Sequence, residues 1–122
     1  IEIAAELGEL GDAKEAVAEL HAIAKEYGGI VHEASARSGK GCILLREGKV
    51  GEAVPELRGA LRTWNELNFP YRGARTRLLL GRAYAAAGNE EASKLEFQAA
   101  RAAFERLGAK IDRMRAEELL AG

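Results

Sequence analysis

The run Ser38-Gly39-Lys40-Gly41 carries part of the glycine-rich loop that binds nucleotide phosphates. The full motif has a glycine five residues before its second glycine and a serine or threonine after its lysine. Backbone N–H groups hold the phosphates there, and the hydroxyl binds Mg²⁺. In this chain those two positions are Ala34 and Gly41. The run therefore does not predict a nucleotide site.

Metal or nucleophilic chemistry would have to come from one cysteine and two histidines. His21 and His32 are eleven residues apart, whereas histidines that ligate a metal from one helix stand about four apart. Cys42 has no second cysteine for an internal disulfide, and a small buried apolar residue is its commonest role. A lone cysteine also favours a reducing, cytoplasmic setting. We predict no catalytic residue, no metal ligand and no cofactor, and hence a protein that is not an enzyme.

One charge pattern differs from the rest of the chain. No acidic residue occurs between Glu66 and Glu90, yet four arginines fall there: Arg72, Arg75, Arg77 and Arg82. Two of them, Arg75 and Arg82, are spaced so that they share one face of a helix. Because a guanidinium can bind a carboxylate through two parallel hydrogen bonds, this face could receive an acidic or C-terminal segment of a partner. The alternative is that these arginines pair with glutamates of neighbouring helices or are solvated.

An internal repeat predicts the elements that position these side chains. Short turns begin at Gly11, Gly48 and Gly88, which stand at nearly equal intervals. Small or apolar residues stand five, nine, twelve and sixteen positions after each glycine, and these steps of four and three mark one helix face. Each unit is therefore predicted to be a helix, a glycine turn and a second helix. The recurring positions are Ala16, Ala53 and Ser93; Leu20, Leu57 and Phe97; Ile23, Ala60 and Ala100; Tyr27, Trp64 and Phe104.

Two kinds of residue in the repeat have a packing role. The turn glycines suit the left-handed conformation that ends a helix. Ala4, Gly41 and Gly81, seven residues before each turn glycine, are small and would let the paired helices approach closely. The large residues sixteen positions after each glycine would cover the seam to the next unit.

We predict an all-α chain of about six or seven helices, stacked as antiparallel pairs in a superhelix, or α-solenoid. Hydrophobic residues make up 48% of the chain but aromatic residues only 6%, which favours closely packed helices over a β-sandwich. A single domain would span residues 1–122. Its expected parts are a truncated unit at 1–29, full units at 30–69 and 70–108, and a capping helix at 109–121. The incomplete first unit suggests a piece of a larger protein.

These positions resemble the tetratricopeptide repeat family. The pair Gly81 and Tyr84, the turn Gly88-Asn89 and the series Ser93, Phe97 and Ala100 match the family's pattern. The unit is a few residues longer than the family's, Lys40 stands where leucine is usual, and no proline ends the unit. In that family the first helix of each pair lines a concave groove. The resemblance implies a partner-binding groove at Ser35, Ser38, Cys42, Leu45, Arg75, Leu78 and Arg82.

A narrower resemblance concerns residues 70–82 and 99–109. Both runs look like the repeat region of large multidomain bacterial LuxR-type transcriptional regulators, where repeats lie between an ATP-binding signalling module and a DNA-binding helix-turn-helix. Similar runs occur beside nucleotide cyclase domains. The resemblance implies a sensor or interaction role in transcription regulation. It implies no DNA contact by this segment, because no helix-turn-helix is evident in it.

We therefore predict a non-catalytic cytoplasmic scaffold for protein–protein or interdomain contacts. Its partner would be an acidic segment of another protein or another domain of the same chain. One alternative is a sensor that binds a small-molecule effector, and another is an oligomerisation module that dimerises through exposed ends of the stack. The net charge of −1 argues against nucleic acid as the main partner, and no run of about 20 apolar residues predicts a membrane span.

Overall fold

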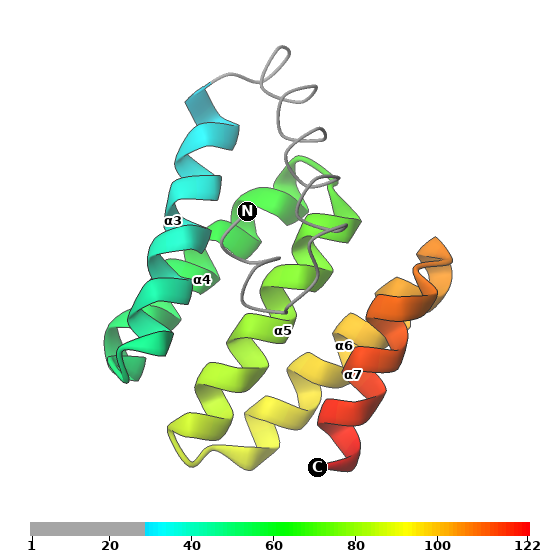
Figure 1. The fold of residues 1–122 in the computed structure, drawn as a ribbon. Coiled ribbons are helices and arrows are strands. Elements are labelled where there is room, and N and C mark those ends of the chain that lie inside the picture. Colours follow the sequence, from blue (N-terminus) through cyan, green and yellow to red (C-terminus); the bar gives the residue numbers. More distant parts are fainter. Residues whose placement is uncertain (1–28) are drawn as a thin grey trace.

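The computed structural model describes residues 29–122. Residues 1–28, which include Gly11, His21 and most of the predicted truncated unit, lie outside the described residues. The described part is all-α, as predicted, and contains no strand (Figure 1). Its five helices account for five of the six or seven expected. They are α3 (Gly29–Arg46), α4 (Val50–Glu66), α5 (Pro70–Ala86), α6 (Glu90–Leu107) and α7 (Lys110–Ala121).

Each helix packs mainly against the next one along the chain, from α3 through to α7. The connections are only two or three residues long, so consecutive helices run antiparallel (Figure 1). Helices α3 and α7 lie at opposite ends of the row (Figure 1). We call α3–α4 the first hairpin and α5–α6 the second hairpin. Helix α5 packs against both α4 and α6, the second helices of the two hairpins. The pairs α3–α4 and α5–α6 match the units expected at residues 30–69 and 70–108 to within one residue, since α3 begins at Gly29.

The same turn ends four successive helices at regular intervals along the sequence. Gly48, Asn68, Gly88 and Gly108 all have positive φ, at 78°, 60°, 82° and 72°. In each turn the following N–H bonds to the carbonyl five residues back, as from Lys49 to Leu44 and from Phe69 to Trp64, both at 2.8 Å between nitrogen and oxygen. These bonds satisfy carbonyls that a helix end would otherwise leave unpaired. The prediction of left-handed glycines at positions 48 and 88 is confirmed, and Asn68 takes the same role without being a glycine.

Replacing Gly88 with alanine is expected to lower the free energy of unfolding by about 1 kcal/mol, because a side chain is strained at a φ of 82°. The matched control is Gly51→Ala on α4, where an added Cβ meets nothing within 4 Å and φ is not positive. Urea unfolding followed by circular dichroism compares the two variants. Equal destabilisation by both changes would show that the turn conformation is not the cause.

The close approach of paired helices depends on two small residues, as predicted. A Cβ on Gly41 of α3 would lie 2.6 Å from Cγ of Leu57 on α4. At the equivalent place in the second hairpin, a Cβ on Gly81 of α5 would overlap the ring of Phe97 on α6. Both contacts belong to the interior of a hairpin, so the two units share this feature of their packing.

The large residues near the ends of α4 and α6 are buried at the seams between units. Trp64 is 1% exposed, and its ring centroid lies 6.2 Å from that of Phe69. The guanidinium carbon of Arg72 lies 5.5 Å from the Trp64 ring centroid. Phe104 is fully buried, meets the Tyr71 ring edge-on at 5.9 Å and belongs to one core cluster with Ala116 of α7. Trp64 thus contacts the start of the next hairpin, which is the role that the repeat predicted for it.

Two further features of the described helices follow from their sequences. Pro70 starts α5 in the first turn, where its missing N–H costs nothing, and the Asn89 side chain accepts a hydrogen bond from the Ala92 N–H to cap α6. Among residues 29–122, no helix combines the length and hydrophobicity that crossing a membrane requires.

Candidate functional site

The seven residues of the predicted groove do not line a common open surface. Ser38, Cys42, Arg75 and Leu78 are all at most 4% exposed, while Ser35, Leu45 and Arg82 are half-buried. Cys42 packs in a cluster with residues of α4 and α5, and Leu78 packs in a second cluster with residues of α6 and α7. The helix faces that the family resemblance assigned to a groove are here covered by neighbouring helices. The four buried side chains are therefore not accessible to a partner in this arrangement.

Arg75 is the clearest correction, because its charge is used inside the chain. Its Nη1 donates a hydrogen bond to the Tyr71 hydroxyl at 2.9 Å, and that hydroxyl donates to Oδ2 of Asp112 on α7 at 2.8 Å. Nη1 also lies 3.7 Å from Oδ1 of Asp112. Arg75 and Asp112 are 4% and 5% exposed. The cluster of Tyr71, Arg75 and Asp112 joins α7 to α5. Arg75 is thus paired within the chain, although with an aspartate of α7 and not with a glutamate as the alternative expected.

The Tyr71 hydroxyl is held in its protonated form. Burial raises the pKa of Tyr71 far above its usual value, and this outweighs the opposing effect of the Arg75 charge. The phenol therefore keeps its proton and can relay a hydrogen bond from the guanidinium to the carboxylate. The three side chains thus form a hydrogen-bonded bridge between α5 and α7.

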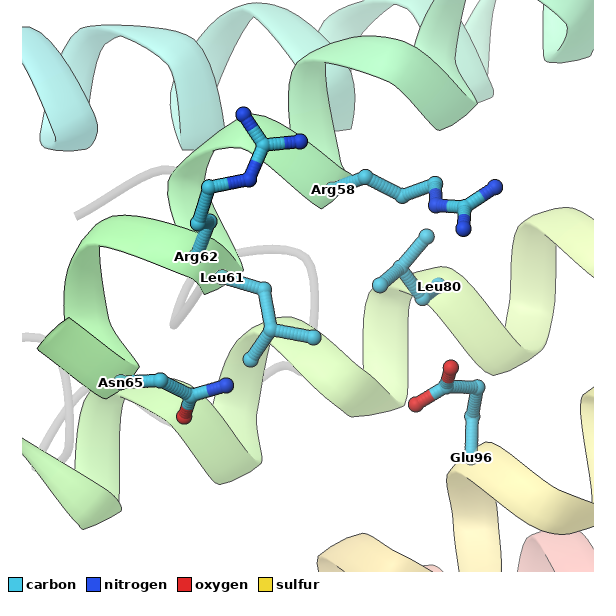
Figure 2. A pocket seen from close by; sticks show the side chains of 6 residues that line it. All are labelled: Arg58, Leu61, Arg62, Asn65, Leu80 and Glu96. Atoms are coloured by element: carbon cyan, nitrogen blue, oxygen red, sulfur yellow. The ribbon is translucent and has the colours of Figure 1, made fainter.

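A different surface, between α4 and α6, is open. One pocket of about 280 Å³ is bordered by α4, α5 and α6, and Figure 2 shows its lining: Arg58, Leu61, Arg62, Asn65, Leu80 and Glu96. A second pocket of about 270 Å³ is lined by Asn65, Pro70, Gly73, Ala74, Arg77, Ala99, Ala102, Ala103 and Arg106. Asn65 lines both pockets, so they adjoin. We call the two together, with these lining residues, the α4–α6 furrow.

An ion pair joins the two pockets. Arg77 Nη1 of α5 donates to Glu96 Oε1 of α6 at 2.8 Å, and each residue lines one of the pockets. Because Glu96 is the only carboxylate among the residues that line the furrow, this pairing leaves no other acidic group there. The remaining charged residues that line it are all arginines.

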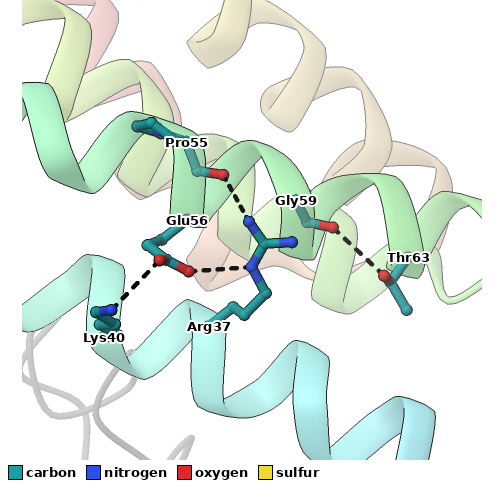
Figure 3. Close-up of polar contacts among 6 residues, drawn as sticks. All are labelled: Arg37, Lys40, Pro55, Glu56, Gly59 and Thr63. Atoms are coloured by element: carbon teal, nitrogen blue, oxygen red, sulfur yellow. Dashed lines mark hydrogen bonds and ion pairs between the residues drawn. The ribbon is translucent and has the colours of Figure 1, made fainter.

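The equivalent ion pair occurs in the first hairpin, as Figure 3 shows. Arg37 Nε donates to Glu56 Oε1 at 3.0 Å, and its Nη2 donates to the Pro55 carbonyl at 3.2 Å. The guanidinium lies over Gly59, where any Cβ would collide with it. The hydrogen bond from Arg37 is the main cause that lowers the pKa of Glu56. The Arg77–Glu96 pair agrees with the alternative expected from the sequence, in which these arginines pair with glutamates of neighbouring helices. The Arg37–Glu56 pair was not predicted, although in each hairpin the arginine precedes its glutamate by the same interval.

Three arginines of the furrow have no intramolecular partner in the described part of the chain. Arg58 and Arg62 of α4 and Arg106 of α6 are exposed, and none of them forms a hydrogen bond or ion pair with another described residue. The apolar floor between them includes Leu61 and Leu80. The sequence did not predict this exposed arginine surface because α4 and α6 also carry many glutamates. The signal that could have indicated it is the spacing of four between Arg58 and Arg62, which marks one helix face.

Within residues 29–122, no three His, Cys, Asp or Glu side chains gather as metal ligands would, and the Cys42 thiol is buried. The furrow presents exposed arginines beside an apolar surface. Comparisons with protein families, with curated proteins and with solved structures each found no match to this chain.

Proposed function

We propose that this chain is a non-catalytic scaffold that binds a partner protein or a neighbouring domain of the same protein, and that its helix pairs form a tetratricopeptide-like superhelix. The observation that carries the proposal is the α4–α6 furrow, an exposed basic and apolar surface on a regular array of helix hairpins. Repeat arrays of this kind provide extended surfaces for binding, since each unit contacts only its neighbours.

Comparison of the two hairpins supports a role for that surface. The interior contacts recur in both hairpins, in the ion pairs and in the two glycines that face Leu57 and Phe97. The exposed arginines do not recur, because Arg58 and Arg62 correspond to Gln98 and Ala102. Packing therefore accounts for what the units share, and it gives no reason for the arginines of the furrow.

The cellular context of the scaffold rests on sequence. The likeness of residues 70–82 and 99–109 to the repeat region of bacterial LuxR-type regulators supports an interdomain or sensor role in a cytoplasmic transcriptional regulator. In such a protein the furrow would receive a segment of an adjacent module. The test is to express the chain together with its flanking domains and to measure binding between the furrow and the adjacent module. In a regulator, that binding is expected to change with the state of the signalling module.

A small-molecule sensor is favoured less. Sites for small ligands usually enclose roughly 300–1,000 Å³ and bring a few polar groups together. The two adjoining pockets reach that volume only together, and the side chains of Arg58 and Arg62 diverge instead of converging on one ligand (Figure 2). Dimerisation through the stack end stays a prediction. It would bury the exposed Ile111 and Met114 of α7, and light scattering of a Met114→Lys variant would test it.

The scaffold proposal is tested by selecting random displayed peptides against the immobilised chain, with counter-selection on the bare support. A scaffold is expected to enrich related sequences that bind with dissociation constants of roughly 1–100 μM, typical of short segments that bury little surface. Calorimetry on synthetic copies measures the affinity. Repeated selections without any sequence enriched above the support would contradict the proposal.

A further inference from the structure

We infer that the α4–α6 furrow binds an acidic peptide segment whose carboxylates pair with Arg58, Arg62 and Arg106. This inference rests on the proposed scaffold function and assigns its ligand class and its site. The site differs from the groove expected from the sequence, because the furrow is formed by the second helices of the two hairpins and by the face of α5 between them.

The shape of the furrow suits an extended chain with apolar side chains. Its two adjoining pockets, of about 280 and 270 Å³, share Asn65 and follow one another along α5. Gly73 and Ala74 of α5 and Ala102 of α6 keep the second pocket open, because they carry little or no side chain. Each pocket has room for one or two side chains, so successive residues of a peptide could occupy them in turn.

The charge of the furrow selects an acidic occupant. Glu96 is neutralised by Arg77, so the three exposed arginines leave the furrow with a net positive charge of three. The chain as a whole carries a net charge of −1, which makes this a local feature. Guanidinium groups without intramolecular partners do not have to give up an existing ion pair when they bind a carboxylate. An apolar floor beside them favours a segment in which acidic residues alternate with residues such as leucine.

Nucleic acid is the less suitable anionic partner. No aromatic side chain lines the furrow, so bases would have no ring on which to stack. Three unpaired arginines are also few for a phosphate backbone, and the chain lacks the basic excess usual for nucleic-acid binding. The apolar floor with Leu61 and Leu80, by contrast, could contact the apolar side chains of a peptide.

The test uses fluorescence anisotropy with the whole chain and three labelled probes. The first is a peptide of about ten residues that alternates glutamate with leucine, the second replaces each glutamate with glutamine, and the third is a single-stranded oligonucleotide. The glutamate peptide is expected to bind, and to bind more weakly as salt rises, because the arginines are exposed. The glutamine peptide is expected to bind at least about tenfold more weakly.

The variant that removes the site is Arg58→Ala with Arg62→Ala, which takes away two exposed side chains that make no hydrogen bond or ion pair with the described residues. Its affinity for the glutamate peptide is expected to fall at least about tenfold. The matched control is Lys94→Ala with Lys110→Ala, which removes the same charge from exposed positions of α6 and α7 that do not line the furrow. The control is expected to change affinity less than about twofold. Circular dichroism checks that both variants keep their helix content.

Three results would overturn the inference: equal losses in the variant and its control, equal binding of the glutamate and glutamine peptides, or tighter binding of the oligonucleotide. If the glutamate peptide fails to bind while the display selection yields other ligands, the furrow assignment is wrong and the scaffold function stands. If neither experiment yields a ligand, the scaffold function itself fails.

Discussion

Replacing Asp112 with alanine is expected to weaken the docking of α7 by about 3–5 kcal/mol, because it leaves the Arg75 guanidinium buried without that carboxylate. Arg75 is only 4% exposed, and its Nη1 lies 2.9 Å from the Tyr71 hydroxyl that bridges to Asp112. Amide hydrogen exchange measures the effect helix by helix, and α7 is expected to lose its protection before α4 or α5 does.

A double replacement separates the buried charge from the packing. Arg75→Met combined with Asp112→Leu removes both ionic groups, so no charge is left buried and much of the lost stability is expected to return. If Asp112→Ala costs less than about 1 kcal/mol, as a solvated surface pair would, then Arg75 is not held as the structure shows. Arg75 would then be available to a partner, as the sequence suggested.

Replacing Trp64 with alanine is expected to lower the free energy of unfolding by about 3–5 kcal/mol, because a large buried side chain would leave a cavity. Trp64 is 1% exposed and packs in a cluster with Val31 and Ala34 of α3 and Ala60 of α4. Its ring also meets Phe69 and Arg72 at the start of the second hairpin. Urea unfolding gives the change in stability, and a change in the unfolding slope would show that the two hairpins no longer unfold together.

The repeat supplies a control for this prediction. Phe104 stands at the equivalent place in the second hairpin, so Trp64→Phe installs the side chain that this hairpin already uses. The Trp64 indole N–H is buried and makes no hydrogen bond to the described residues, so phenylalanine removes no such bond. Trp64→Phe is therefore expected to cost clearly less than Trp64→Ala. Equal losses from the two variants would mean that the seam does not tolerate the equivalent residue and that the units are not structurally alike.

The helices and turns of the described part could be predicted because their causes are local. Residues at steps of three and four mark a helix face, a glycine after the last turn marks its end, and Gly41 and Gly81 precede those ends by the same interval. Asn68 was not recognised as the equivalent of the turn glycines, although asparagine is the other residue that tolerates positive φ. Because Asn68 is not a glycine, the glycine pattern alone does not show that the four turns recur at one regular interval.

The candidate site could not be predicted because its parts meet only through tertiary packing. The partner of Arg75 is Asp112, which lies two helices further along the chain on a helix whose docking the sequence does not specify. The α4–α6 furrow draws its arginines from two helices that also carry many glutamates. Spacing alone does not show that Glu56 and Glu96 are turned towards Arg37 and Arg77 while Arg58 and Arg62 remain exposed.

The central claim is that this array of helix hairpins binds an acidic segment in the α4–α6 furrow. The most direct measurement is a titration of the isotope-labelled chain with the glutamate–leucine peptide, followed by the amide signals in two-dimensional NMR spectra. We predict that the largest shifts fall in residues 58–65, 73–80 and 99–106, with little change in α7. Shifts confined to α3 and to the part of α5 around Arg82, or no shifts at all, would contradict the account.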